Sequence, residues 1–115
     1  DFKLAVRLGI AIALVEVIGG LIKIIFPKTR PVPMPARTFH QKWKSGSFPS
    51  IHAARTTTVG IFLIKAFGNW PIISISLLMA LGVGYSRIYL KKHYVLDVIA
   101  GFAVGTIISL VVLAA

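Results

Sequence analysis

The chain has 115 residues, of which 57% are hydrophobic and 14% charged, and its mean hydropathy is +0.86. This composition excludes an ordinary soluble domain and indicates a small polytopic membrane protein. Thirteen Lys and Arg residues against three acidic ones give a net charge of +10, which suits anionic lipid headgroups or phosphorylated substrates, while the long apolar runs argue against a nucleic-acid partner.

The first apolar run covers residues 4–26 and is long enough, at about 1.5 Å per residue, to cross a hydrocarbon core of about 30 Å. Residues 27–50 hold five of the six prolines together with several Lys and Arg residues, so they predict a polar loop. The chain starts without Met and shows no small-residue cleavage site. We therefore interpret residue 1 as a boundary of the sequence, and we do not expect the residues that follow it to form a signal peptide.

The remaining apolar runs predict three more helices. Pro49-Ser50 is a helix start for residues 51–67, which contain Arg55 and are less apolar, so we expect this helix inside a bundle and away from lipid. A tight turn at residues 68–71 separates it from a third span over 72–88, and a fourth span covers 94–115. The sequence thus predicts one all-α, membrane-embedded domain over residues 1–115, a transmembrane bundle of about four spans.

Polar residues gather at one end of this expected bundle. If consecutive spans alternate in direction, one membrane face receives Lys23, Arg30, Ser50, His52, Arg87, His93 and Asp97. Cations, imidazoles and carboxylates are costly in a bilayer unless they serve a bound group. The pattern therefore predicts one composite site that handles phosphate.

Three segments at this face form a recognisable signature. Residues 23–31 read Lys, six residues, Arg-Pro; residues 49–52 read Pro-Ser-Ile-His; and residues 86–97 read Ser-Arg, five residues, His, three residues, Asp. This arrangement resembles the tripartite signature of the type 2 phosphatidic acid phosphatase superfamily, in which Gly stands where this chain has Ile51. Family members commonly have six spanning helices, and this chain resembles the last four. The resemblance implies a helical membrane phosphatase whose site faces the extracytoplasmic side.

Three residues are candidates for catalysis. His93 and Asp97 are four apart, so on one helix they would share a face, and the carboxylate would accept the proton of one ring nitrogen. The other nitrogen would then be free to attack phosphorus and form a phosphohistidine that water hydrolyses. His52, at the start of the second helix, would protonate the leaving oxygen as general acid.

Five residues are candidates for binding the phosphate. Lys23, Arg30 and Arg87 would neutralise the charge on the oxygens of the transferring phosphoryl group. The hydroxyl of Ser50 and the backbone N–H of Ile51 would complete the cradle at the helix start.

We expect neither a metal nor another cofactor, because the only carboxylates, Asp1, Glu16 and Asp97, cannot gather into a site for a hard cation. The reaction that we expect is hydrolysis of a lipid phosphate or diphosphate, and phosphatidate, polyprenyl diphosphate and phosphatidylglycerol phosphate stay open as substrates. Two alternatives also stay open. One is a phosphotransferase that uses the same intermediate, and the other is a noncatalytic basic membrane protein that binds anionic lipid through residues 27–50.

Some residues outside the signature also carry expectations. Arg55 would contact substrate or, as we favour, pair with Glu16, for which Thr56, Thr57 and Thr58 are other partners. Gly101 and Gly105 predict close helix packing within the bundle and not a dimer interface. The remaining expectations are interfacial belt positions for Phe2, Trp43, Trp70, Tyr89 and Tyr94, and an anchor or lid role for Phe39, His40 and Trp43 in the loop.

Overall fold

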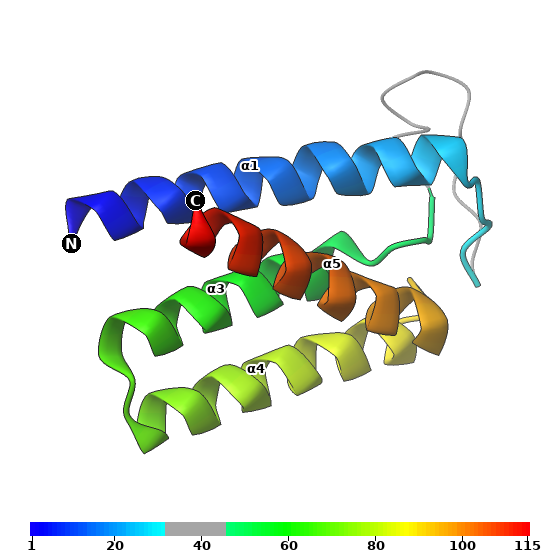
Figure 1. Cartoon of the computed structure of the whole chain (residues 1–115). Helices are drawn as coiled ribbons and strands as arrows, with labels where there is room; N and C mark the ends of the chain where they lie inside the picture. Colours follow the sequence, from blue (N-terminus) through cyan, green and yellow to red (C-terminus); the bar gives the residue numbers. More distant parts are fainter. Residues whose placement is uncertain (32–45) are drawn as a thin grey trace.

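A computed structural model of the chain describes residues 1–31 and 46–115, and in these residues four α-helices form an antiparallel bundle (Figure 1). The helices are α1 (Phe2–Ile25), α3 (Ile51–Phe67), α4 (Trp70–Tyr89) and α5 (Val95–Ala114). Each bound lies within two residues of the predicted one. The all-α prediction is confirmed, and predictions for residues 32–45, including the lid role of His40, lie outside the described residues.

The helix ends follow from local capping. Ser50 precedes α3, and its hydroxyl oxygen accepts the backbone N–H of Ala53 at 3.3 Å. Gly68, with a φ of 63°, ends this helix in the left-handed conformation. Asn69 then caps α4 by accepting the N–H of Ile72 at 3.0 Å. Because proline is tolerated in a first turn, α4 begins at Trp70, two residues before the predicted start.

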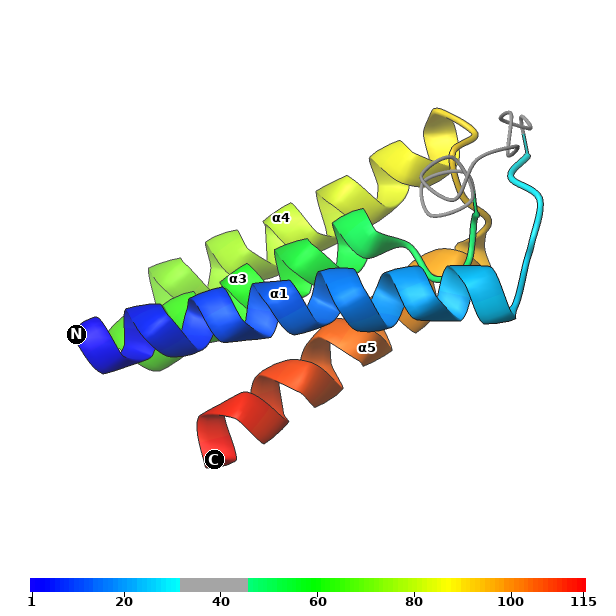
Figure 2. The ribbon, with the colours of Figure 1, turned by 90° about the horizontal axis from the view of Figure 1, so that it is seen from above.

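Helix α3 occupies the centre of the bundle. It packs against each of the other three helices, and α1 and α4 lie on opposite sides of it (Figures 1 and 2). Among the described residues three helices, α1, α4 and α5, are long and apolar enough to cross a membrane, whereas α3 has 17 residues. The contacts of α3 with all three other helices agree with the expected place of the second helix inside a bundle.

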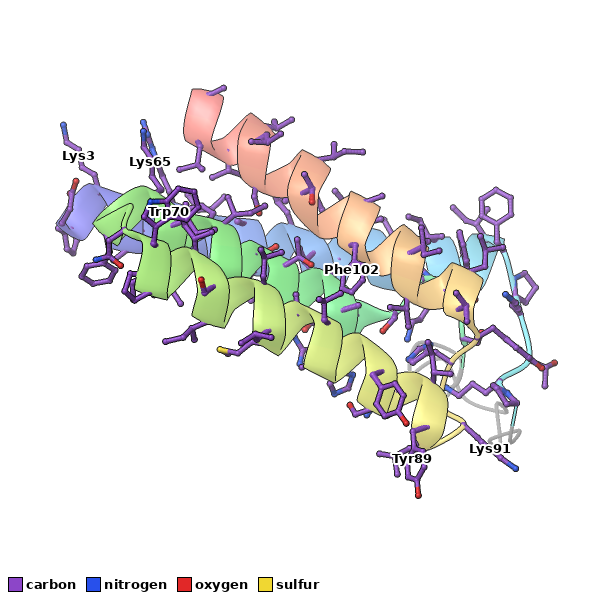
Figure 3. All side chains as sticks on the ribbon, turned by 90° about the horizontal axis from the view of Figure 1, so that it is seen from below. Lys3, Lys65, Trp70, Tyr89, Lys91 and Phe102 are labelled. Atoms are coloured by element: carbon purple, nitrogen blue, oxygen red, sulfur yellow. The ribbon has the colours of Figure 1, made fainter. Side chains whose placement is uncertain are left out.

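The distribution of side chains is inverted relative to a soluble protein. Fully buried side chains include His93, Asp97, Ser47 and Thr58, whereas large apolar side chains such as Leu78 are exposed along the helices. An apolar outer surface is suited to lipid, so the bundle is an integral membrane domain. Figure 3 shows Lys3, Lys65 and Trp70 at one end, and Tyr89 and Lys91 at the other, as expected for residues at the two membrane interfaces.

Close contact between α3 and α5 depends on two glycines. A Cβ atom at Gly101 would collide with the carbonyl oxygen of Ser50, and one at Gly105 would collide with that of Ala54. The hydroxyl of Thr58 also donates to the carbonyl of Gly105 at 3.4 Å. The two glycines thus serve packing inside the bundle, as the sequence predicted, and they bring the starts of α3 and α5 together.

Candidate active site

Four chain segments meet at one end of the bundle: the end of α1, the start of α3, the end of α4 and the start of α5 (Figures 1 and 2). All seven polar residues that the alternation of spans assigned to one membrane face lie at this end. They are Lys23, Arg30, Ser50, His52, Arg87, His93 and Asp97.

His93 is held in the short turn between α4 and α5. The backbone N–H groups of Lys92 and His93 both donate to the carbonyl of Arg87, at 3.0 and 3.2 Å, and Lys91 makes the turn with a φ of 57°. The buried ring places its Nδ1 atom 2.7 Å from the carbonyl oxygen of Ser47. Because a carbonyl oxygen only accepts, Nδ1 carries the proton and Nε2 keeps its lone pair.

The surroundings of His93 keep its ring neutral. Burial lowers the pKa of His93 from 6.5 to about 4, against the opposing effect of the hydrogen bond to the carbonyl of Ser47. The positive charges of Arg30, Lys23 and Arg87 lower this pKa further. At neutral pH the ring is therefore a neutral imidazole and not an imidazolium.

Asp97 does not form the expected hydrogen bond to His93. The expectation placed both residues on one helix, but α5 begins at Val95, so His93 precedes the helix, and its Nδ1 lies 4.0 Å from Oδ2 of Asp97. The buried carboxylate instead accepts from Lys28 Nζ at 2.6 Å, from the hydroxyl of Ser47, and from the backbone N–H of Tyr94 at 2.7 Å. Asp97 thus makes hydrogen bonds to the segments that flank the His93 ring, and it makes none to the ring itself.

Three cations gather around the imidazole. Lys23, in the last turn of α1, and Arg30, in the segment that follows α1, are both buried, and Arg87 lies in the last turn of α4. Burial and the charge of Arg87 lower the pKa of Arg30. The Nε atom of Arg87 is buried and has no hydrogen-bond partner among residues 1–31 and 46–115. Like charges concentrated in this way, with an unused donor, form a site suited to an anion.

Two glycines make room around the candidate phosphate-binding residues. A Cβ atom at Gly46 would lie 3.0 Å from Cβ of Lys23, so the chain passes closely over the lysine stem. A Cβ atom at Gly19 would lie 3.0 Å from Cγ1 of Ile51. Ile51 therefore packs its side chain against α1 at Gly19, which explains how isoleucine is accommodated where the family has glycine.

The start of α3 holds the other two candidates. The Ser50 hydroxyl oxygen caps α3, and the backbone N–H of Ser50 donates to the carbonyl of Asp97 at 2.9 Å. His52 is exposed, and its ring lies within the field of Arg87, Arg55, Lys23 and Arg30. The structure thus places the second imidazole at the same cationic end as His93.

Glu16 pairs with Arg55, as we favoured. The Nη2 atom of Arg55 donates to Oε1 of Glu16 between α3 and α1, and both side chains are about 40% exposed (42% and 39%). The expectation that threonines would serve Glu16 is wrong. The hydroxyls of Thr56 and Thr57 donate to carbonyls one turn earlier in α3, and that of Thr58 donates to α5. The bonds of Thr56 and Thr57 are the usual ones for threonine within a helix, whose hydroxyl donates to the carbonyl four residues earlier.

The sequence patterns missed Lys28 and Ser47. Lys28 lies within the six-residue interval of the first motif, where any residue fits the pattern, and Ser47 precedes the second motif by two residues. Both side chains contact Asp97, which lies 69 and 50 positions away from them in the chain. No spacing rule connects residues so distant, so nothing in the sequence alone indicated them.

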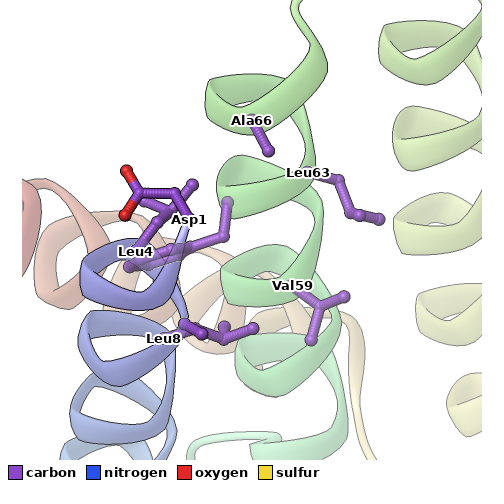
Figure 4. Close-up of a pocket in the computed structure, with 8 residues that line it drawn as sticks. Asp1, Leu4, Leu8, Val59, Leu63 and Ala66 are labelled. Carbon is purple, nitrogen blue, oxygen red and sulfur yellow. The ribbon is translucent and has the colours of Figure 1, made fainter.

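An apolar cavity of about 210 Å³ lies at the other end of the bundle, between the start of α1 and the end of α3. Figure 4 shows its lining, which includes Leu4, Leu8, Val59, Leu63 and Ala66, with Asp1 at its edge. The cavity is separate from the cationic end and has no basic side chain in its lining. It is therefore not part of the candidate phosphate site.

Comparisons with known proteins agree on one family. A model of the PAP2 superfamily matches residues 4–115. An undecaprenyl-diphosphatase of Sulfolobus acidocaldarius is 32% identical over 109 residues, and an undecaprenyl-diphosphatase of Bacillus subtilis (BcrC) is 32% identical over 98 residues. A lipid A 4'-phosphatase of Bacteroides thetaiotaomicron is 40% identical over 58 residues.

These alignments cover 93%, 81% and 50% of the chain, and 52%, 48% and 26% of the three relatives in the same order. The chain therefore spans about half the length of the first two relatives. No solved structure matches the chain significantly.

Proposed function

The chain belongs to the PAP2 superfamily, and on this premise we propose that the protein is a membrane phosphatase that hydrolyses a lipid phosphate or diphosphate. Relatives named undecaprenyl-diphosphatase favour polyprenyl diphosphate over phosphatidate and phosphatidylglycerol phosphate as the substrate. The apolar outer surface of the bundle suits a substrate that enters the site laterally from the bilayer.

The observation that best supports this proposal is the protonation state and environment of His93. Its ring is buried and neutral, its Nδ1 is bound to a carbonyl, and three cations surround it. Nε2 attacks phosphorus, so that a P–N bond forms while the P–O bond to the leaving group breaks. His52 donates a proton to the leaving oxygen. Water then attacks the phosphohistidine, His52 takes up its proton, and the P–N bond breaks to release phosphate.

The cations supply the electrostatic part of catalysis. Lys23, Arg30 and Arg87 would hold the equatorial oxygens of the phosphoryl group, with the unused Nε of Arg87 as one donor. The hydroxyl of Ser50 and the backbone N–H of Ile51, at the positive end of α3, would add to this cradle. The charge on the phosphoryl oxygens is distributed differently in the transition state and in the substrate. Fixed positive charges that match the distribution in the transition state therefore stabilise it more than they stabilise the substrate.

We also propose that the cationic end of the bundle faces the extracytoplasmic side. The support for this orientation is the resemblance of the three motifs to those of the family. A single cysteine introduced at Thr29, in a chain that otherwise has none, tests it by reaction with a membrane-impermeant maleimide in intact cells. Labelling only after the membrane is opened would contradict the orientation.

Phosphate release from a panel of detergent-solubilised lipids tests the function itself. The panel contains polyprenyl diphosphate, phosphatidate and phosphatidylglycerol phosphate, and the proteins are the wild type, His93→Ala and His93→Asn. The asparagine amide can keep a donor toward the carbonyl of Ser47. We expect release by the wild type and loss of more than about a thousandfold in both variants, with lipid binding retained.

The same assay separates the alternatives. Binding of anionic lipid by the wild type without phosphate release would indicate the noncatalytic protein. Transfer of labelled phosphate to an added alcohol acceptor, without hydrolysis, would indicate a phosphotransferase.

A further inference from the structure

We propose that Ser47 is the positioning residue of His93 and that Lys28 and Asp97 hold Ser47 in place. We call these three residues the Ser47 bridge. The inference rests on the proposed function, because it assigns the groups that orient its nucleophile. In this arrangement Asp97 acts on His93 through Ser47 and not by direct contact.

Ser47 is fully buried, and each of its polar groups has a partner. Its backbone N–H donates to the carbonyl of Lys28 at 3.0 Å, and its hydroxyl donates to Oδ2 of Asp97. Its carbonyl oxygen accepts Nδ1–H of His93 at 2.7 Å. The position of this carbonyl, and so that of the imidazole, is therefore fixed from both sides.

Lys28 completes the bridge through two groups. Its backbone carbonyl accepts from Ser47, and its Nζ lies 2.6 Å from Oδ1 of Asp97. The ammonium also lies 4.9 Å from the ring centre of Tyr94, within range of a cation–π contact. One side chain thus joins the segment after α1 to the first turn of α5, and it neutralises a carboxylate that has no solvent exposure.

This arrangement changes what Asp97 does for the nucleophile. In a direct pair the carboxylate would select the tautomer of the imidazole, but here the carbonyl of Ser47 selects it. Asp97 acts by holding the Ser47 hydroxyl, and its charge 4.0 Å from Nδ1 favours the positive ring of the phosphohistidine. Removal of the Ser47 hydroxyl should therefore impair the orientation of the His93 ring, as should removal of the Asp97 carboxylate.

A double-mutant cycle in the full chain tests the bridge, with kcat and KM measured for lipid phosphate hydrolysis. Ser47→Ala should lower kcat by about tenfold to a hundredfold with KM within about twofold, since a small displacement of a nucleophile has effects of this size. The effects of Ser47→Ala and Asp97→Asn should not multiply, and the double variant should resemble the slower single one. Multiplying effects, or a Ser47→Ala enzyme with wild-type kcat, would overturn the proposal.

Ser109→Ala is the matched control. Ser109 is also a fully buried serine, but its hydroxyl donates to the carbonyl of Gly105 one turn earlier in α5, away from His93. We expect wild-type kcat from this variant. A fall equal to that of Ser47→Ala would mean that loss of any buried serine hydroxyl disturbs the bundle, which would also overturn the proposal.

Nitrogen-15 NMR of histidine-labelled protein tests the bridge without any assay of activity. The signals of His93, assigned by their loss in His93→Asn, should show a protonated Nδ1 and an unprotonated Nε2 at pH 7 in the wild type. Ser47→Ala should mix the two tautomers, and Ser109→Ala should not. An Nε2–H tautomer in the wild type would overturn the bridge. A wild type with the expected tautomer but no phosphatase activity would instead count against the proposed function alone.

Discussion

The backbone N–H of Ser50 donates a 2.9 Å hydrogen bond to the backbone carbonyl of Asp97, which joins the start of α3 to the start of α5. One turn further along α5, Gly101 lies against the carbonyl of Ser50, with no room for a Cβ atom. The segments that carry His52 and Asp97 are therefore held together by backbone contact. A small change in this contact should affect the whole site.

We predict that Gly101→Ala lowers both stability and activity. The added methyl group pushes the start of α3 away from α5, and overpacking of this kind costs about 1–3 kcal/mol. Thermal unfolding in detergent should show a lower midpoint, and kcat should fall by at least about tenfold. Gly82→Ala on α4 is the control, because a Cβ atom there meets nothing within 4 Å. Equal behaviour of the two variants would contradict the packing role of Gly101.

Burial of neutral His93 should make the protein sensitive to acid. The pKa of His93 is about 4 in the folded state and 6.5 as the ordinary value, so between these pH values the unfolded chain binds more protons. The stabilisation is complete above pH 6.5 and is lost as the pH falls toward 4, by about 3 kcal/mol in all.

Unfolding midpoints at pH 7 and pH 4.5 measure this loss. His93→Asn, which cannot titrate, should lose less stability over this interval than the wild type does. The same acid-induced loss in both proteins would show that other groups are responsible.

Activity should not depend on a metal ion. Of the three acidic side chains of the chain, Asp97 is bound to Lys28 and Ser47, Glu16 is paired with Arg55, and Asp1 caps the start of α1. Phosphate release should therefore persist in EDTA. Vanadate, which resembles the trigonal-bipyramidal transition state, should inhibit it. Loss of activity in EDTA that added Mg²⁺ restores would refute this prediction.

The ion pair between Glu16 and Arg55 should stabilise the contact of α1 with α3. Glu16→Gln leaves the guanidinium without its acidic partner within the bundle, so the unfolding midpoint in detergent should fall. The double variant Glu16→Leu, Arg55→Leu should recover most of the loss, because it removes both charges. A double variant less stable than Glu16→Gln would indicate that Arg55 has another essential partner.

The sequence predicted the fold well because hydropathy and capping signals are local. The expectation that consecutive spans alternate in direction also predicted that His52 and His93 would lie at the same end of the bundle. The prediction failed where it assumed a continuous helix from His93 to Asp97. Helix α5 begins only at Val95, because the carboxylate of Asp97 turns back to cap the N–H of Tyr94.

The contacts of Ser47 and Lys28 could not be predicted for a different reason. They depend on how the segment after α1 passes the segment before α3, and no periodicity describes such a crossing. Ile51 is a third example. It departs from the family pattern, and its side chain packs against Gly19 of α1, a residue far from it along the chain.

Trapping of the phosphorylated protein tests directly whether His93 is the nucleophile. Wild type, His93→Asn and Ser109→Ala are mixed with a lipid substrate that is radiolabelled at the terminal phosphate and quenched within milliseconds. We expect label on His93 in the wild type and in Ser109→Ala, stable in base and labile in acid, and none in His93→Asn. Turnover by the wild type with no trapped label, or label on any residue other than His93, would contradict it.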